Sequence, residues 1–128
     1  MKFQWKHGLI WISLTLGYDG QEYTIDNCIV DTGSASTAVD INIVPFNYQK
    51  PAIIKMLFGI GGGEQEVVSQ EVDSLKLGQE TFKNINIEFG DLAVDFGING
   101  FIGTDLLSQF LLSIDFIKQE IMFSKQTE

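Results

Sequence analysis

The pattern of apolar and polar positions along the chain is that of short β-strands. Leu9–Leu16 is rich in β-branched and aromatic residues and leads into Asp19-Gly20, a dipeptide that favours hairpin turns. The return segment, Glu22–Val30, alternates polar and apolar positions and then becomes continuously apolar at Cys28-Ile29-Val30. We therefore predict a hairpin whose second strand enters the core immediately before Asp31.

The middle of the chain predicts a second, longer hairpin with a glycine-rich end. Ala52–Phe58 and Gln65–Val72 flank the tip Gly59-Ile60-Gly61-Gly62-Gly63. Two further strands are predicted at Thr37–Val44 and Asn84–Phe89, with a turn at Gly78-Gln79 between Leu77 and the second of them. In Asn84–Phe89 the alternation is strict, which predicts Ile85, Ile87 and Phe89 inward and Asn84, Asn86 and Glu88 outward.

One helix is predicted, at about Thr104–Leu111. Its apolar residues share one face at helical spacing, and Thr104 or Asp105 can cap its start. A closing hairpin follows, from Leu112–Phe116 and Glu120–Phe123 with a turn near Lys118-Gln119. The pattern predicts an all-β fold with one short C-terminal helix, in a single domain over residues 1–128.

Composition and charge limit the classes of partner that the protein is expected to bind. The chain has 128 residues and a net charge of −9, and all eight basic residues are lysines, so a nucleic-acid partner is not expected. No apolar run approaches the roughly 20 residues of a membrane span, and Leu9–Leu16 is too short for a signal peptide. We expect a soluble cytoplasmic protein without a membrane partner.

Several kinds of chemistry lack the residues they need. With one His and one Cys, His7 and Cys28, the chain can build neither a zinc cluster nor an internal disulfide. The glycines of 59–63 are not followed by the Lys-Ser/Thr of a phosphate-binding loop, and Asp19 and Asp26 lack the spacing of a calcium loop. No metal and no cofactor are expected.

Asp31 is the carboxylate that stands out. It follows three apolar residues at the end of a core strand, where a charge is costly unless it is hydrogen-bonded or functional. The next residues, Thr32, Gly33 and Ser34, are small, so the chain can turn tightly and leave the carboxylate facing a cleft. A turn in which Asp31 merely accepts backbone N–H bonds is the structural alternative.

Three segments, in order, resemble the retropepsin-like aspartic proteases. Ile29-Val30-Asp31-Thr32-Gly33-Ser34 is similar to the signature of that family, in which two hydrophobic residues precede Asp-Thr-Gly-Ser/Ala. The segment 56–63 falls where the family has its glycine-rich flap. Phe101-Ile102-Gly103, followed by Thr104–Leu107, is similar to its hydrophobic-hydrophobic-Gly segment and short helix. The resemblance runs from about residue 9 to residue 116 and implies a closed, barrel-like retropepsin fold.

The resemblance also implies an activity: an aspartic endopeptidase in which two carboxylates activate a water molecule. The chain holds one Asp-Thr-Gly and no second copy, so the other carboxylate would be Asp31 of a second subunit, and a homodimer is expected. Phe3 and Trp5 are candidate interface residues. A retropepsin-fold module that dimerises or binds peptides without cleaving them is the alternative, and an unrelated ligand-binding β-barrel is a third reading.

The resemblance assigns roles around this centre. Asp31, Thr32 and Gly33 would form the catalytic loop, with Thr32 bonding across the two-fold axis. Ser34 and Ala35, with Phe58, Gly59, Ile60, Gly61 and Gly62 of the flap, would bind an extended polypeptide substrate. The Ser34 hydroxyl could donate a hydrogen bond to the carboxylate, which predicts a more acidic rate optimum than in Ser34→Ala. Ala35 stands where retroviral enzymes often have Asp, and the acidic Glu64 and Glu66 could disfavour acidic substrates.

Overall fold

The regular structure of the chain is mostly β-strand, as the alternating pattern predicts. The computed structural model describes residues 1–58, 63–92 and 97–125. In these residues it forms ten strands and one short helix: β1 (Gln4–Lys6), β2 (Leu9–Tyr18), β3 (Gln21–Val30), β4 (Ala38–Asp40), β5 (Ile53–Phe58), β6 (Glu64–Leu77), β7 (Glu80–Gly90), β8 (Gly100–Ile102), α1 (Thr104–Leu107), β9 (Leu111–Asp115) and β10 (Glu120–Ser124). The helix is too short and too polar to cross a membrane, and no other described segment is a helix.

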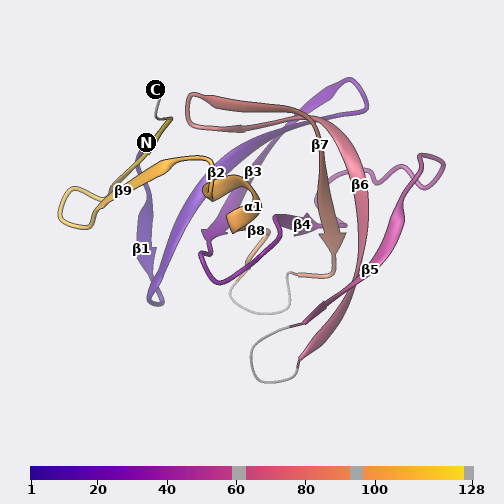
Figure 1. Cartoon of the computed structure of the whole chain (residues 1–128), viewed down its shortest axis with the longest axis horizontal. Coiled ribbons are helices and arrows are strands. Elements are labelled where there is room, and N and C mark those ends of the chain that lie inside the picture. Colours follow the sequence, from indigo (N-terminus) through magenta and orange to yellow (C-terminus); the bar gives the residue numbers. More distant parts are fainter. Residues whose placement is uncertain (59–62, 93–96, 126–128) are drawn as a thin grey trace.

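Eight of these strands form one sheet that closes partly on itself (Figure 1). The order is β1-β2-β3-β8-β4-β7-β6-β5, and an additional pairing of β2 with β6 joins the two arms of the sheet into a ring. The ring encloses an apolar core to which most strands contribute, including Leu16, Ile25, Leu75 and Phe89. The predicted all-β, barrel-like fold with one short helix is confirmed.

The predicted first hairpin forms with its predicted turn. Asp19 and Gly20 have φ of 50° and 76°, the left-handed conformations that a tight turn between twisted strands requires. Its return strand, β3, pairs in parallel with β8, so that Val30 lies opposite Ile102. The backbone N–H of Asp31 continues this ladder by donating to the Ile102 carbonyl at 2.9 Å. Asp31 therefore leaves the sheet from a fixed point in its centre.

One side chain of β7 lies where the pattern did not place it. Glu88 was predicted to point outward with Asn84 and Asn86, which are indeed exposed, but Glu88 is buried. The end of β7 pairs with β4 on one side and β6 on the other, with Glu88 opposite Ala38 and Ser69. Lys55 of β5 lies over this position, with its Nζ 3.8 Å from Glu88 Oε1, so the outward position is not open to solvent.

Two predicted elements are shorter in the structure. The strand predicted at Thr37–Val44 is β4 alone, because the Asp40 carboxylate accepts the N–H of Asn42 at 3.2 Å and the chain turns there. The helix ends at Leu107 rather than at Leu111, since Leu111 already begins β9. Its N-cap is Gly103, which provides no side-chain cap, so Thr104 and Asp105 have other partners.

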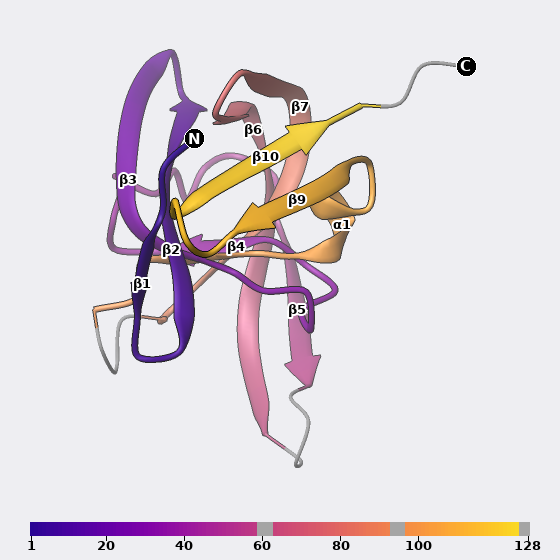
Figure 2. The same cartoon turned by 90° about the vertical axis from the view of Figure 1, so that its left-hand side faces the viewer.

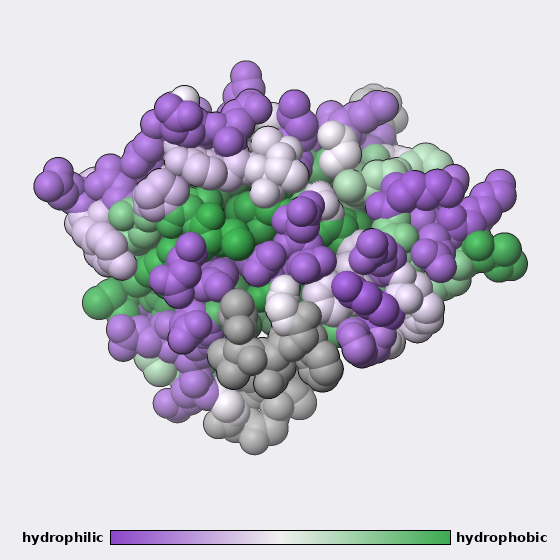
Figure 3. All heavy atoms as spheres, turned by 180° about the vertical axis from the view of Figure 1, so that it is seen from behind, coloured by the Kyte–Doolittle hydropathy of each residue, from purple (hydrophilic) through white to green (hydrophobic). Residues whose placement is uncertain are grey.

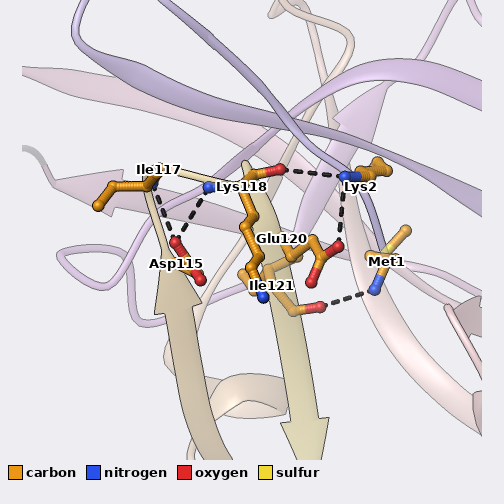
Figure 4. A network of polar contacts seen from close by, with 7 residues as sticks. All are labelled: Met1, Lys2, Asp115, Ile117, Lys118, Glu120 and Ile121. Carbon is orange, nitrogen blue, oxygen red and sulfur yellow. Dashed lines mark hydrogen bonds and ion pairs between the residues drawn. The ribbon is translucent and has the colours of Figure 1, made fainter.

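The closing hairpin, β9–β10, forms a separate two-stranded sheet to which the first residues of the chain are bound (Figure 2). The Met1 ammonium donates to the Ile121 carbonyl at 2.8 Å, and Lys2 forms an ion pair with Glu120 at 3.2 Å (Figure 4). In the turn between the strands the Asp115 carboxylate accepts the N–H groups of Ile117 and Lys118, at 3.0 Å each. The first residues of the chain are therefore held against the closing hairpin, beside the ring.

Candidate active site

The Asp31 loop forms one wall of a cleft of about 320 Å³. The opposite wall is the end of the β5–β6 hairpin. The described residues that line the cleft are Asp31, Ser34, Ala38, Leu57, Phe58, Gly63, Glu64, Gln65, Leu92 and Phe101. The lining residues thus come from the loop after β3 and from the end of the long hairpin, with Ala38, Leu92 and Phe101 between them. Its surface is mainly apolar, with carboxylates at Asp31 and Glu64.

Asp31 is half-buried and is held by its own turn. The Ser34 N–H donates to the Asp31 carbonyl at 3.1 Å, which closes a β-turn, and the Gly33 N–H donates to Asp31 Oδ1 at 3.0 Å. Within the described residues no donor reaches Oδ2. The turn predicted as the structural alternative is therefore present, and it coexists with a carboxylate that faces a cleft. One oxygen fixes the loop and the other is left for a second group.

The loop is fastened to the start of α1 by residues distant in sequence. Thr37 donates twice to Asp105, from its N–H to Oδ2 at 3.0 Å and from its hydroxyl to Oδ1 at 2.7 Å. The Thr37 hydroxyl accepts the Gly103 N–H at 3.0 Å, while the Thr104 N–H donates to the Ser34 carbonyl at 2.8 Å. No buried side-chain polar atom among the described residues lacks a hydrogen-bond partner, and this network holds the loop against the start of α1.

Gly103 allows this close approach. A Cβ at this position would lie 2.5 Å from the Ser36 carbonyl oxygen and 2.8 Å from that of Ser34. Both contacts are with backbone, which cannot rotate away. The glycine of the Phe-Ile-Gly segment is thus required by packing against the Asp31 loop.

Only some of the predicted substrate-binding residues line the cleft. Ser34 and Phe58 line the cleft, with Phe58 74% exposed, whereas Ala35 is exposed outside it. The Ser34 hydroxyl donates to the Ser36 carbonyl at 2.8 Å, so the expected hydrogen bond to the Asp31 carboxylate is absent from this structure. Thr32 is exposed beside Gly33. The remaining predicted residues, Gly59, Ile60, Gly61 and Gly62, lie outside the described residues.

Several lining residues were not predicted. Leu57, Gln65 and Phe101 are the clearest cases. Phe101 had a usable signal: Ile102 next to it is fully buried in the core, so alternation along β8 turns Phe101 to the opposite face. Leu57 and Gln65 are paired partners on the hairpin, and no local pattern marks them as facing Asp31.

Outside the cleft we considered the Cys28 thiol as a nucleophile and clusters of side chains as metal ligands. Burial raises the pKa of the Cys28 thiol to about 12, with a smaller contribution from the Asp26 charge. A thiol in this state is a poor nucleophile at neutral pH, and Cys28 packs as a small apolar residue of the core. Among the residues that the structure describes, no group of three or more His, Cys, Asp or Glu side chains could hold a metal ion.

Comparison with known protein families shows to which family the chain belongs. A family model for "Retroviral aspartyl protease" matches residues 4–115, which is most of the chain and includes both the Asp31 loop and α1. The chain belongs to this family. Membership of the retroviral aspartyl protease family supports aspartic protease activity, and members of the family act as dimers on polypeptide substrates.

A solved structure shows the same fold. The crystal structure of a retropepsin-like aspartic protease from Rickettsia conorii superposes with a TM-score of 0.58 at 20% sequence identity, covering 89% of this chain and 82% of that one. At this identity the likeness concerns the fold. No curated protein matches the chain.

Proposed function

We propose that two copies of this chain form an aspartic endopeptidase in which the Asp31 carboxylates of both subunits activate a water molecule. The observation that carries the proposal is the state of Asp31: a half-buried carboxylate in a cleft, with Oδ1 bound to its own loop and Oδ2 without a described donor. The sequence holds one Asp-Thr-Gly, so one subunit supplies one half of the catalytic pair.

The reaction follows from bringing two such carboxylates together. At about 3 Å apart the two groups share one proton, because both cannot ionise cheaply. The ionised carboxylate takes a proton from water, which attacks the scissile carbonyl carbon, while the protonated one donates to the carbonyl oxygen. Thr32 and Gly33 are exposed beside Asp31, where a second subunit can contact them, and we assign Thr32 to bonding across the axis.

The proposed substrate is a polypeptide in extended conformation. The cleft is bounded by a strand hairpin on one side and the loop on the other, and an extended peptide can pair with strand edges of this kind. Leu57, Phe58 and Phe101 provide apolar contact surface. We assign Ser34, Phe58 and residues 59–62 to substrate binding, and we place Ala35, exposed outside the cleft, at its margin.

The second subunit would cover an apolar surface at the chain ends. Seen from behind, apolar residues form a band across the middle of the molecule and reach its outline in places (Figure 3). Trp5, Phe116 and Ile117 are 49%, 52% and 97% exposed, and the ring centroids of Trp5 and Phe116 lie 5.1 Å apart. Phe3, the other residue predicted at the interface, is instead buried in the core. We propose Trp5, with the β9–β10 hairpin, as part of the dimer contact, and residues 1–128 as a single protease domain.

The test compares cleavage of an unstructured polypeptide between about pH 4 and 7 by the wild type and by Asp31→Asn, because a carboxylate pair holds one proton in this range. Cleavage by the wild type alone supports the proposal. Equal, negligible cleavage by both would support the non-catalytic module. Gel filtration over a concentration series tests the dimer separately, and specific activity should fall on dilution, since the monomer has one carboxylate.

A further inference from the structure

Glu88 is a buried carboxylate that the proposed reaction does not use. The residue is 5% exposed, and no side-chain hydrogen bond to it occurs among the described residues. Its one described ionic partner is Lys55, whose Nζ lies 3.8 Å from Oε1, beyond hydrogen-bonding distance. Among the described residues no buried side-chain oxygen lacks a hydrogen-bond partner, so the carboxylate oxygens of Glu88 keep some contact with solvent and can accept a partner that arrives from it.

The strand register places Glu88 next to the cleft. In-register neighbours point to the same face of a sheet, and Glu88 lies opposite Ala38 of β4, which lines the cleft. The neighbouring positions Val39 and Phe89 are fully buried in the core on the other face. Glu88 therefore lies on the face of the sheet that borders the cleft, beside the short side chain of Ala38.

Lys55, on the β5–β6 hairpin, lies over Glu88. It lies two residues before Leu57 on β5, and therefore on the same face as this cleft residue. Its side chain is 49% exposed, while that of Glu88 is 7% exposed. An ion pair with one half-exposed partner at this distance is weak, and Lys55 can move into solvent at little cost.

The charge around the cleft favours an incoming cation. The charged residues among its described lining are Asp31 and Glu64, both acidic, and the whole chain carries a net charge of −9. A site with one sign of charge attracts ligands of the other sign and repels those of its own. A guanidinium can also form two parallel hydrogen bonds to a carboxylate, which Lys55 does not provide at its present distance.

We propose that Glu88 makes the subsite over Ala38 selective for a basic substrate side chain, arginine before lysine, with Lys55 as the resident cation that the substrate displaces. This inference rests on the proposed protease function and specifies its substrates as polypeptides with a basic residue near the scissile bond. Glu88 is then a specificity residue that never contacts the reacting atoms.

The experiment uses a peptide series in which one position at a time near the scissile bond is Arg, Lys, norleucine or Glu. At one position the wild type should cleave the Arg peptide with a kcat/KM about tenfold or more above that of the norleucine peptide. Glu88→Gln should abolish this ratio, and Lys55→Ala should increase it, because the competing cation is gone. Glu22→Gln, which removes the same charge from an exposed position at the far end of β3, should leave the ratio unchanged.

The experiment distinguishes failure of the specificity inference from failure of the proposed protease function. If peptides are cleaved without a basic preference, or if the preference survives in Glu88→Gln, the inference is overturned and the proposed function stands. If no peptide is cleaved, the same Arg and norleucine peptides are compared for binding to Asp31→Asn by fluorescence anisotropy. A preference for Arg that Glu88→Gln removes then supports the inference without the protease, and equal binding overturns it. Should Glu88→Gln fail to fold, an unchanged ratio in Lys55→Ala overturns it.

Discussion

Both oxygens of the Asp105 carboxylate accept hydrogen bonds from Thr37, one from its backbone N–H and one from its hydroxyl. The two residues are 68 positions apart, and Thr37 is fully buried. Through this contact the first turn of α1 fixes the end of the loop that begins at Asp31. The short helix is therefore part of the support of the candidate active site.

Breaking the Thr37–Asp105 contact should destabilise the protein. Asp105→Ala leaves two buried donors of Thr37 without an acceptor, which costs about 1–3 kcal/mol. Urea unfolding measures the loss, with Glu22→Ala as an exposed control. In a double-mutant cycle with Thr37→Val the coupling free energy should reach about 1 kcal/mol, because the residues are in direct contact. Strictly additive losses would show that the hydrogen bond from the Thr37 hydroxyl to Asp105 contributes nothing to stability.

Gly103→Ala should displace the Asp31 loop. The added methyl group would meet the Ser36 and Ser34 carbonyl oxygens at 2.5 and 2.8 Å, so the backbone must move, at a cost of about 1–3 kcal/mol typical of overpacking. The melting temperature in thermal unfolding and the kcat for peptide cleavage should both be lower than in the wild type. Gly63→Ala is the matched control for stability, since nothing lies within 4 Å of its added Cβ. Equal melting temperatures for the two variants would contradict the prediction.

Ser34→Ala should change stability more than pH dependence. The hydroxyl donates to the Ser36 carbonyl, so its removal costs about 0.5–1.5 kcal/mol of folding free energy. Because no hydrogen bond joins it to the Asp31 carboxylate, the rate optimum should stay where it is in the wild type. A pH–rate profile of both proteins tests this. A shift of the optimum to higher pH in the variant would instead support the interaction expected from the sequence.

Cys28 should make the protein less stable at alkaline pH. Its pKa is raised from 9.0 to about 12 by burial, so the unfolded chain loses this proton at lower pH than the folded one. The thiol's contribution is therefore complete below about pH 9 and is lost as the pH rises towards 12. The difference in unfolding free energy between wild type and Cys28→Ala should shrink between pH 8 and 11. A difference independent of pH would mean that the folded thiol titrates normally.

Local signals predicted the parts of the molecule that depend on neighbours in sequence. Asp19-Gly20 marked a turn because few residues adopt positive φ easily, and the apolar run before Asp31 marked a strand that ends in the core. The prediction that Glu88 points into solvent was wrong, because its burial depends on which strands flank β7, and this is a property of the whole sheet. The Thr37–Asp105 contact had no signal either, since it joins distant segments.

The parallel pairing of β3 with β8 has a consequence for how the protein is made. Asp31 leaves the ring from β3, whose second partner, Gly100–Ile102, comes some seventy residues later, and its loop is fastened by Asp105. Contacts of such long sequence separation form slowly, and on a ribosome they cannot form before the later segment has emerged. We expect the first hairpin to form early and the Asp31 loop to take its shape among the last steps, so that a nascent chain carries the motif long before it carries the site.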